Sequence, residues 1–118
     1  MMQREITILE DDRDIREIFT YLFTSEGYKV NGFDSVSAFL NYPTHPDIFL
    51  LDVMLPDGSG LDVCRDLKAN PGYSSTPIIM MSAHLEKANM VGHCKAEEFL
   101  EKPFDIDLLL SHVDKLIK

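Results

Sequence analysis

DIFLLDVMLPDGSG, residues 47–60, is the stretch from which the fold can be inferred. Its apolar run at 48–51 is too short for a buried helix and typical of a strand inside a parallel sheet. The run stops at the carboxylate of Asp52, and the chain then turns through the Pro-Asp-Gly-Ser-Gly sequence at 56–60. Open α/β sheets bind their ligands at the carboxyl ends of the strands. Asp52 is therefore the first candidate for a reactive group.

Four further segments predict strands, and helical patterns separate them. The strands are expected at 5–9, 28–33, 77–81 and 96–100, and the helices follow Asp12 and occupy about 35–40, 61–69, 85–93 and 106–117. This alternation requires crossover connections and hence a parallel sheet covered on both faces. We expect one three-layer α/β domain over 1–118. The residues expected to bury one face of the first and last helices are Ile15, Ile18, Phe19, Leu22 and Phe23, then Ile106, Leu109, Leu110, Val113 and Ile117.

Composition excludes several classes of function. The net charge of −9 argues against non-specific nucleic-acid binding, which depends on Lys and Arg. The sequence has no signal-peptide core, and no apolar run approaches the roughly 20 residues of a membrane span. Cys64 and Cys94 are too few for a disulfide framework and indicate reduced thiols. We expect a soluble cytoplasmic domain that contacts neither membrane nor nucleic acid.

Polar residues stand at the carboxyl ends of four of the predicted strands, which lie along one edge of the sheet. Glu10 and Asp11 follow the first strand, Asp52 and Ser82 end two others, and Lys102 follows the last. Neighbouring carboxylates repel one another unless a cation joins them, and hard oxygen ligands suit Mg²⁺. A carboxylate, Mg²⁺, a hydroxyl and an ammonium together can support phosphoryl transfer.

Four motifs, in order and across the whole chain, resemble the receiver domain of bacterial two-component response regulators. They are ILEDD at 8–12, LLDVMLPDGSG at 50–60, IMMSA at 79–83 and EEFLEKPF at 97–104. The resemblance implies the flavodoxin-like doubly wound fold, with five parallel strands in the order 2-1-3-4-5 and five helices. It also implies a role in phosphorelay signalling, in which the phosphorylated domain signals by changing its conformation. The domain is then not an enzyme, except that it assists its own phosphorylation and dephosphorylation.

The same resemblance implies the acceptor and the metal ligands. Asp52 is expected to take a phosphoryl group from the phosphohistidine of a sensor kinase or a histidine phosphotransfer protein. Asp11 is expected to bind Mg²⁺ directly and Glu10 mainly through water, with the backbone carbonyl of Met54 completing the protein ligands. Asp12 falls one position too late and is expected to cap the first helix.

The remaining site roles concern the phosphoryl oxygens and the switch. Ser82 and Lys102 are expected to contact these oxygens, and the bond before Pro103 is a candidate cis peptide. Phe99 stands at the position of the family's switch aromatic, which turns inward when Ser82 moves toward the phosphorylated Asp52. The signal would then pass to a downstream protein or a fused output domain.

Two side chains are expected to tune hydrolysis of the phosphorylated form. They are Met54, two residues after the acceptor, and His84, two residues after Ser82. The sequence departs from the family pattern nearby, because Lys95 replaces a common glycine and the 20 positions from Ser82 to Lys102 are fewer than usual.

Two alternatives remain open. A Mg²⁺-dependent phosphohydrolase with an aspartyl nucleophile usually has a second acid two residues on, where this chain has Met54. A degenerate receiver that only binds other proteins would not need the complete acidic, hydroxyl and lysine set. Phosphorylation of the chain and release of phosphate from other substrates would distinguish both alternatives from a receiver that accepts a phosphoryl group. The sequence identifies neither the kinase nor the pathway, although the Met-Met start favours a natural N-terminus.

Overall fold

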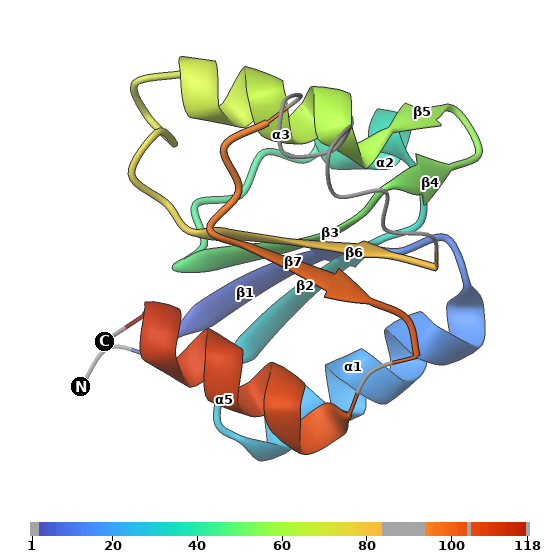
Figure 1. The fold of residues 1–118 in the computed structure, drawn as a ribbon, viewed down its shortest axis with the longest axis vertical. Coiled ribbons are helices and arrows are strands. Elements are labelled where there is room, and N and C mark those ends of the chain that lie inside the picture. The colour runs from blue at the N-terminus through green and yellow to red at the C-terminus, as the bar shows by residue number, and fades with distance from the viewer. Residues whose placement is uncertain (1–2, 84–93, 104, 118) are drawn as a thin grey trace.

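The computed structural model describes residues 3–83, 94–103 and 105–117, and its centre is one parallel sheet (Figure 1). The strand order β2-β1-β3-β6-β7 confirms the predicted flavodoxin-like order 2-1-3-4-5. All neighbouring strands of this sheet run parallel. The five strands are β1 (Glu5–Leu9), β2 (Lys29–Phe33), β3 (Ile48–Asp52), β6 (Ile78–Ser82) and β7 (Glu98–Glu101).

Helices cover both faces of the sheet and give the predicted three layers. Figure 1 shows α1 (Arg13–Ser25) and α5 (Ile106–Leu116) on one face, and α2 (Val36–Asn41) and α3 (Gly60–Ala69) on the other. The described part of the chain contains these four helices, and the helix expected at about 85–93 lies outside it. Among the described residues, none of the helices has both the length and the apolar character needed to span a bilayer.

Alternating side chains of the buried strand β3 divide the core in two. Phe49 and Leu51 pack with the α2 and α3 layer, whereas Ile48 and Leu50 pack with the α1 and α5 layer. All five residues of β3 are buried, and the first four form the continuous apolar run expected of a strand covered on both faces. The two clusters fix the carboxyl end of β3, and with it Asp52, at the middle of one sheet edge.

Two residues predicted to be buried are not. Ile18 is 52% exposed and Ile106 is 43% exposed. Ile18 lies about a quarter turn around α1 from the buried Phe19, at the border of the helix's apolar stripe. Ile106 is the first residue of α5, one turn before the fully buried Leu109. For Ile18 the predicted apolar stripe was wider than the surface of α1 that packs on the sheet. For Ile106 the predicted stripe began one turn before the packed part of α5.

A small antiparallel hairpin follows Asp52 and was not predicted. It pairs β4 (Met54–Leu55) with β5 (Gly58–Ser59). In its turn, the Asp57 carboxylate accepts hydrogen bonds from the backbone N–H groups of Val36 at 2.8 Å and Ser37 at 2.9 Å. These bonds lower the pKa of Asp57. The hairpin therefore caps α2 from outside the helix, in addition to the helix's own N-cap, Ser35.

Side-chain hydrogen bonds tie together the amino ends of the strands, opposite the acidic edge. Lys68 of α3 donates to the Thr76 carbonyl at 3.0 Å and pairs with the Glu97 carboxylate at 2.9 Å. Glu97 accepts from the N–H of Ile78 at 2.8 Å. Further along this edge, the Asp47 carboxylate accepts from the N–H of Glu5 at 2.8 Å. The segments that lead into β1, β3, β6 and β7 are thus fixed by contacts separate from the candidate site.

Candidate functional site

The polar groups predicted to meet at the carboxyl edge of the sheet do so. Glu10 directly follows β1, Asp52 ends β3, Ser82 ends β6, and Lys102 directly follows β7. Glu10 is fully buried, and Asp52 and Ser82 are only 6% and 4% exposed. The register places Asp52 beside Met81, so the ends of β3 and β6 are adjacent.

Lys102 joins the two buried carboxylates. Its Nζ lies 2.6 Å from Glu10 Oε1 and 3.2 Å from Asp52 Oδ2. Its backbone N–H donates to the Ser82 carbonyl at 2.7 Å, and the Lys102–Pro103 peptide is cis, as predicted. The contact with Glu10 was not predicted from sequence, because 92 positions separate the two residues.

The electrostatics of this group follow from its burial. Removal from water raises the pKa of Glu10 to about 7; the neighbouring Asp52 adds to this rise and Lys102 opposes it. Burial acts to lower the pKa of Lys102, but its hydrogen bond with Glu10 and the two nearby negative charges outweigh that effect and raise it. Lys102 therefore keeps its positive charge, and the site contains more carboxylates than this one cation can neutralise.

The three carboxylates can also hold a metal ion. One oxygen each of Glu10, Asp11 and Asp52 lies within 4.8 Å of the others, and Asp11 is exposed while the other two are buried. An all-oxygen set open to water on one side fits Mg²⁺, which retains several waters and takes few carboxylates directly. Met54, whose backbone carbonyl is the predicted fourth ligand, begins β4 two residues after Asp52.

Asp12 has the separate role expected of it. Its Oδ1 accepts a hydrogen bond from the N–H of Ile15 at 3.0 Å, which caps α1. Its own N–H donates to Glu10 Oε2 at 3.2 Å. The helix-cap prediction is thus confirmed, and Asp11 is left as the exposed carboxylate beside Glu10 and Asp52.

Asp11→Ala is expected to weaken Mg²⁺ binding at least tenfold, since it removes one of two carboxylates available for direct ligation. Asp12→Ala is expected to change Mg²⁺ affinity less than about threefold while lowering the unfolding free energy by about 1 kcal/mol through the lost cap. Isothermal titration with Mg²⁺ and urea unfolding of both variants measure the two effects. The opposite order of affinities would assign the metal role to Asp12.

Two residues support the site in ways that the sequence reasoning did not identify. The guanidinium of Arg16 donates to the Glu10 carbonyl at 2.8 Å and so holds the acidic loop against α1. Gly60 begins α3 against the end of β3, where an added Cβ would lie 1.9 Å from the Asp52 carbonyl oxygen. Gly60 belongs to the turn sequence that follows Asp52, but only the fold reveals this close approach to the Asp52 backbone.

Of the residues predicted for switching and hydrolysis, the structure describes Phe99 but not His84. Phe99 lies opposite Met80 in the sheet register, is half-buried and packs against the core on the α2 and α3 face. His84 lies outside the described residues. The roles assigned to Phe99, Ser82 and Met54 in switching and hydrolysis remain predictions.

A comparison with protein families gives one match that covers most of the chain. The model of the response regulator receiver domain matches residues 6–114. The chain belongs to this family, and it is a receiver domain of the two-component type.

Similar solved structures are receiver domains or response regulator proteins. The receiver domain of a signal transduction histidine kinase from Syntrophus aciditrophicus is 30% identical, with 97% of this chain and 89% of that chain covered and a TM-score of 0.84. The BeF3-activated receiver domain of DrrB from Thermotoga maritima is 27% identical, with 98% of each chain covered and a TM-score of 0.87. TrrA from Thermotoga maritima, solved with Mg²⁺-BeF, is 25% identical, with 96% and 98% covered and a TM-score of 0.83.

Proposed function

We propose that Asp52 accepts a phosphoryl group from the phosphohistidine of a sensor kinase or a histidine phosphotransfer protein, and that Mg²⁺ is required. The observation that carries this proposal is the meeting of Glu10, Asp11, Asp52 and Lys102 at one sheet edge, with the Lys102 ammonium 3.2 Å from Asp52. A carboxylate nucleophile beside a fixed cation is the arrangement that phosphoryl transfer needs.

In the proposed step, a carboxylate oxygen of Asp52 attacks phosphorus. The O–P bond forms as the N–P bond of phosphohistidine breaks, and the electron pair leaves with the imidazole nitrogen, which takes a proton. Lys102, whose ammonium lies 3.2 Å from Asp52 Oδ2, is expected to pair with one phosphoryl oxygen, and the Ser82 hydroxyl is expected to bind another. Hydrolysis by water then restores the carboxylate and releases phosphate, so the domain is not a catalyst for external substrates.

The metal would be held by Asp11, Asp52 and the Met54 carbonyl, with Glu10 contributing through water. Bound Mg²⁺ supplies positive charge that offsets the negative charge of the transferring phosphoryl oxygens. The structure's support for this assignment is the compact all-oxygen donor set with one exposed carboxylate. Glu10, Asp11 and Asp52 carry more negative charge than Lys102 alone can neutralise, and a bound cation would relieve their mutual repulsion.

We infer that a partner recognises the phosphorylated state by direct contact, and that Ser82 and Phe99 transmit the change from Asp52 to the contacted surface. Phe99 is half-buried on β7, next to the strand that Ser82 ends, so a shift of Ser82 toward Asp52 changes the space beside Phe99. Phosphorylation then biases two packings of the β7 surface, which a downstream protein or an output domain recognises. The two free, buried cysteines fit the reducing cytoplasm, where we place the domain.

Intact-mass measurement after incubation with Mg²⁺ and acetyl phosphate tests the acceptor. We expect the wild-type chain to gain one phosphoryl group, and Asp52→Asn to gain none because the nucleophilic oxygen is replaced by an amide. Asp57→Asn, a change of the same kind five residues away in the hairpin turn, should still be labelled. Omission of Mg²⁺ should prevent labelling of every variant.

The same experiment separates the two alternatives. Absence of any adduct across a range of Mg²⁺ concentrations would favour a degenerate receiver that only binds proteins. Steady release of phosphate from unrelated phosphomonoesters would favour a phosphohydrolase.

A further inference from the structure

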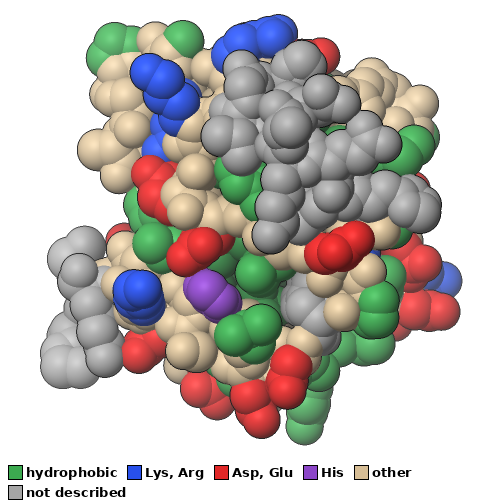
Figure 2. Space-filling model, viewed as in Figure 1, with side chains coloured by type: hydrophobic (Ala, Val, Ile, Leu, Met, Phe, Trp, Pro, Cys, Tyr) green, Lys and Arg blue, Asp and Glu red, His purple; other side chains and the backbone are tan. Residues whose placement is uncertain are grey.

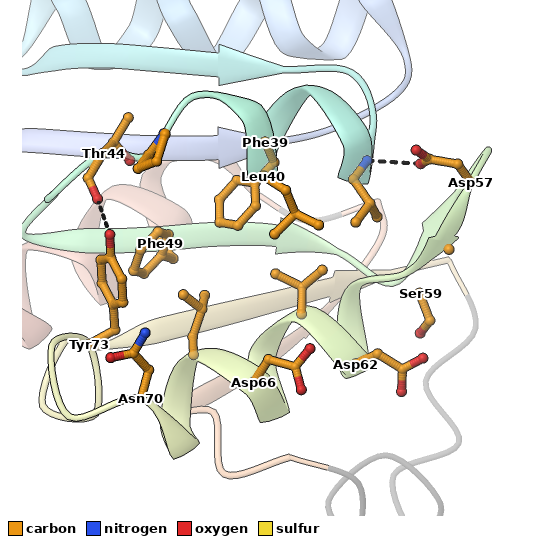
Figure 3. A pocket seen from close by; sticks show the side chains of 15 residues that line it. Phe39, Leu40, Thr44, Phe49, Asp57, Ser59, Asp62, Asp66, Asn70 and Tyr73 are labelled. Atoms are coloured by element: carbon orange, nitrogen blue, oxygen red, sulfur yellow. Dashed lines mark hydrogen bonds between the residues drawn. The ribbon is translucent and has the colours of Figure 1, made fainter.

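A groove of about 410 Å³ lies between α2 and α3, on the face of the sheet away from α1 and α5 (Figure 3). Phe39 and Leu40 of α2 form one wall, and Val63 and Leu67 of α3 form the other. Phe49 of β3 lies at its base. The volume falls within the range of about 300–1,000 Å³ typical of ligand pockets.

The groove exists because α2 is too short to cover the adjacent core. This helix has six residues and is followed by Pro43, which prevents its continuation along α3. Leu40, at the groove's rim, is 65% exposed although it is a large aliphatic residue. An apolar cleft with an exposed leucine at its rim is a surface that gains free energy from burial by a partner.

The charged groups that line the groove are all acidic. They are Asp57 in the hairpin turn and Asp62 and Asp66 on α3. Figure 3 shows Asp62 and Asp66 along the same side of α3, as expected for residues four apart. Asp62 pairs with Arg65 at 3.0 Å, but both side chains are mostly exposed, so this pair is weak.

Asp66 has no ion-pair partner among the described residues, and no Lys or Arg lines the groove. Asp57 is already occupied by the N–H groups of Val36 and Ser37. The groove therefore combines an apolar floor with the carboxylate of Asp66, which is unpaired within the described part of the chain, and with Asp62, whose weak, exposed ion pair can be exchanged for one with a cationic partner.

We propose that this groove docks a basic amphipathic helix of a partner protein. Apolar side chains on one face of that helix enter between α2 and α3, and Arg or Lys residues along its edge, one turn apart, pair with Asp62 and Asp66. The apolar face of such a helix matches the apolar floor of the groove. Its basic residues, one turn apart, have the spacing of about 6 Å expected for Asp62 and Asp66 on α3. The site is separate from the β7 surface, so this proposal does not depend on phosphorylation of Asp52.

The test uses a stapled helical peptide of about 15 residues, long enough to form about four turns. One peptide has Leu at i, i+3 and i+7 on one face and Arg beside them; a second has Glu in place of each Arg. Two-dimensional amide spectra and fluorescence anisotropy of the full chain follow binding. We expect the Arg peptide to shift the amides of Val36, Leu40, Val63 and Leu67, and the Glu peptide to bind at least tenfold more weakly.

Matched variants separate docking from general charge attraction. Asp66→Lys is expected to weaken binding of the Arg peptide about tenfold, whereas Glu26→Lys, the same charge reversal beyond the end of α1, should change it less than twofold. Leu40→Ser should also weaken binding, and Leu108→Ser, an exposed leucine on α5, should not.

Several outcomes would overturn the proposal. One is an equal loss of affinity in Asp66→Lys and Glu26→Lys. Another is equal binding of the Arg and Glu peptides, and a third is amide shifts confined to α1 and α5. A dimer that forms without peptide and dissociates in Leu40→Ser would assign the groove to a second copy of this chain.

Discussion

Replacing Lys102 with methionine is expected to reduce the rate of Mg²⁺-dependent labelling by acetyl phosphate at least 100-fold. The ammonium lies 3.2 Å from Asp52 Oδ2 and is already held in place by Glu10, so it meets the incoming negative charge without reorganisation. Loss of one preorganised donor to the reacting oxygens typically costs about 10²–10³ in rate. Methionine keeps the length and apolar stem of lysine, so the measured loss reports the charge. Intact-mass time courses with saturating Mg²⁺ give the rate.

The same substitution should destabilise the domain by about 3 kcal/mol at neutral pH without Mg²⁺, because it leaves two buried carboxylates without their cation. Lys102 holds down the pKa of Glu10, so its loss raises that pKa further above the ordinary 4.5. The folded variant then binds more protons than the unfolded chain, and its unfolding free energy falls as pH rises from about 5 to about 8. Urea unfolding at both pH values measures this slope.

Lys95→Met is the control for Lys102→Met, because it removes one exposed lysine outside the site. We expect wild-type labelling and a change of no more than about 0.5 kcal/mol in stability. Added Mg²⁺ should partly restore the stability of Lys102→Met. Equal labelling by Lys102→Met and the wild-type chain would remove Lys102 from the proposed mechanism.

Gly60→Ala is expected to lower the unfolding free energy by about 3 kcal/mol. The added Cβ would lie 1.9 Å from the Asp52 carbonyl oxygen and 2.8 Å from the carbonyl carbon, and backbone on both sides must move to relieve the contact. The start of α3 is also fixed by the hydrogen bond from the Gly60 N–H to the Val53 carbonyl at 2.8 Å. The strain therefore acts on the strand end that carries the phosphoacceptor, and labelling should slow as well.

Gly32→Ala provides the matched comparison, because an added Cβ there would be 3.5 Å from the Arg16 side chain, an ordinary contact distance. It should change stability by no more than about 0.5 kcal/mol and leave labelling intact. Similar stability of the two alanine variants would mean that α3 can shift away from β3 at little cost.

The sequence was sufficient to predict the sheet and the polar groups that meet at its carboxyl edge. The apolar runs at 48–51 and 78–81 are buried strands, and their parallel arrangement brings Asp52 and Ser82 to one edge. Each of these inferences depends on residues close together in the chain or on a general rule of α/β topology. The Asp12 cap and the cis bond before Pro103 are of the same local kind.

What the sequence could not supply are contacts between distant segments. No local pattern indicates that Lys102 bonds to Glu10, that Asp57 caps α2, or that Gly60 touches the Asp52 backbone. The exposure of Ile18 was missed for a related reason. Helical periodicity gives the direction of an apolar stripe, but the packed neighbours determine its width.

The hydrogen bonds of Lys68 and Glu97 hold the segments that lead into β6 and β7 at the amino ends of the strands, away from the acidic edge. The Lys68 ammonium joins the carbonyl of Thr76 to the carboxylate of Glu97, which in turn holds the N–H of Ile78, and none of these atoms belongs to the acidic edge. We infer that the carboxyl edge can open locally while the strands stay paired at their amino ends. A rearrangement of the edge that carries Asp52 would then cost less free energy than global unfolding, because the contacts at the amino ends of the strands stay formed.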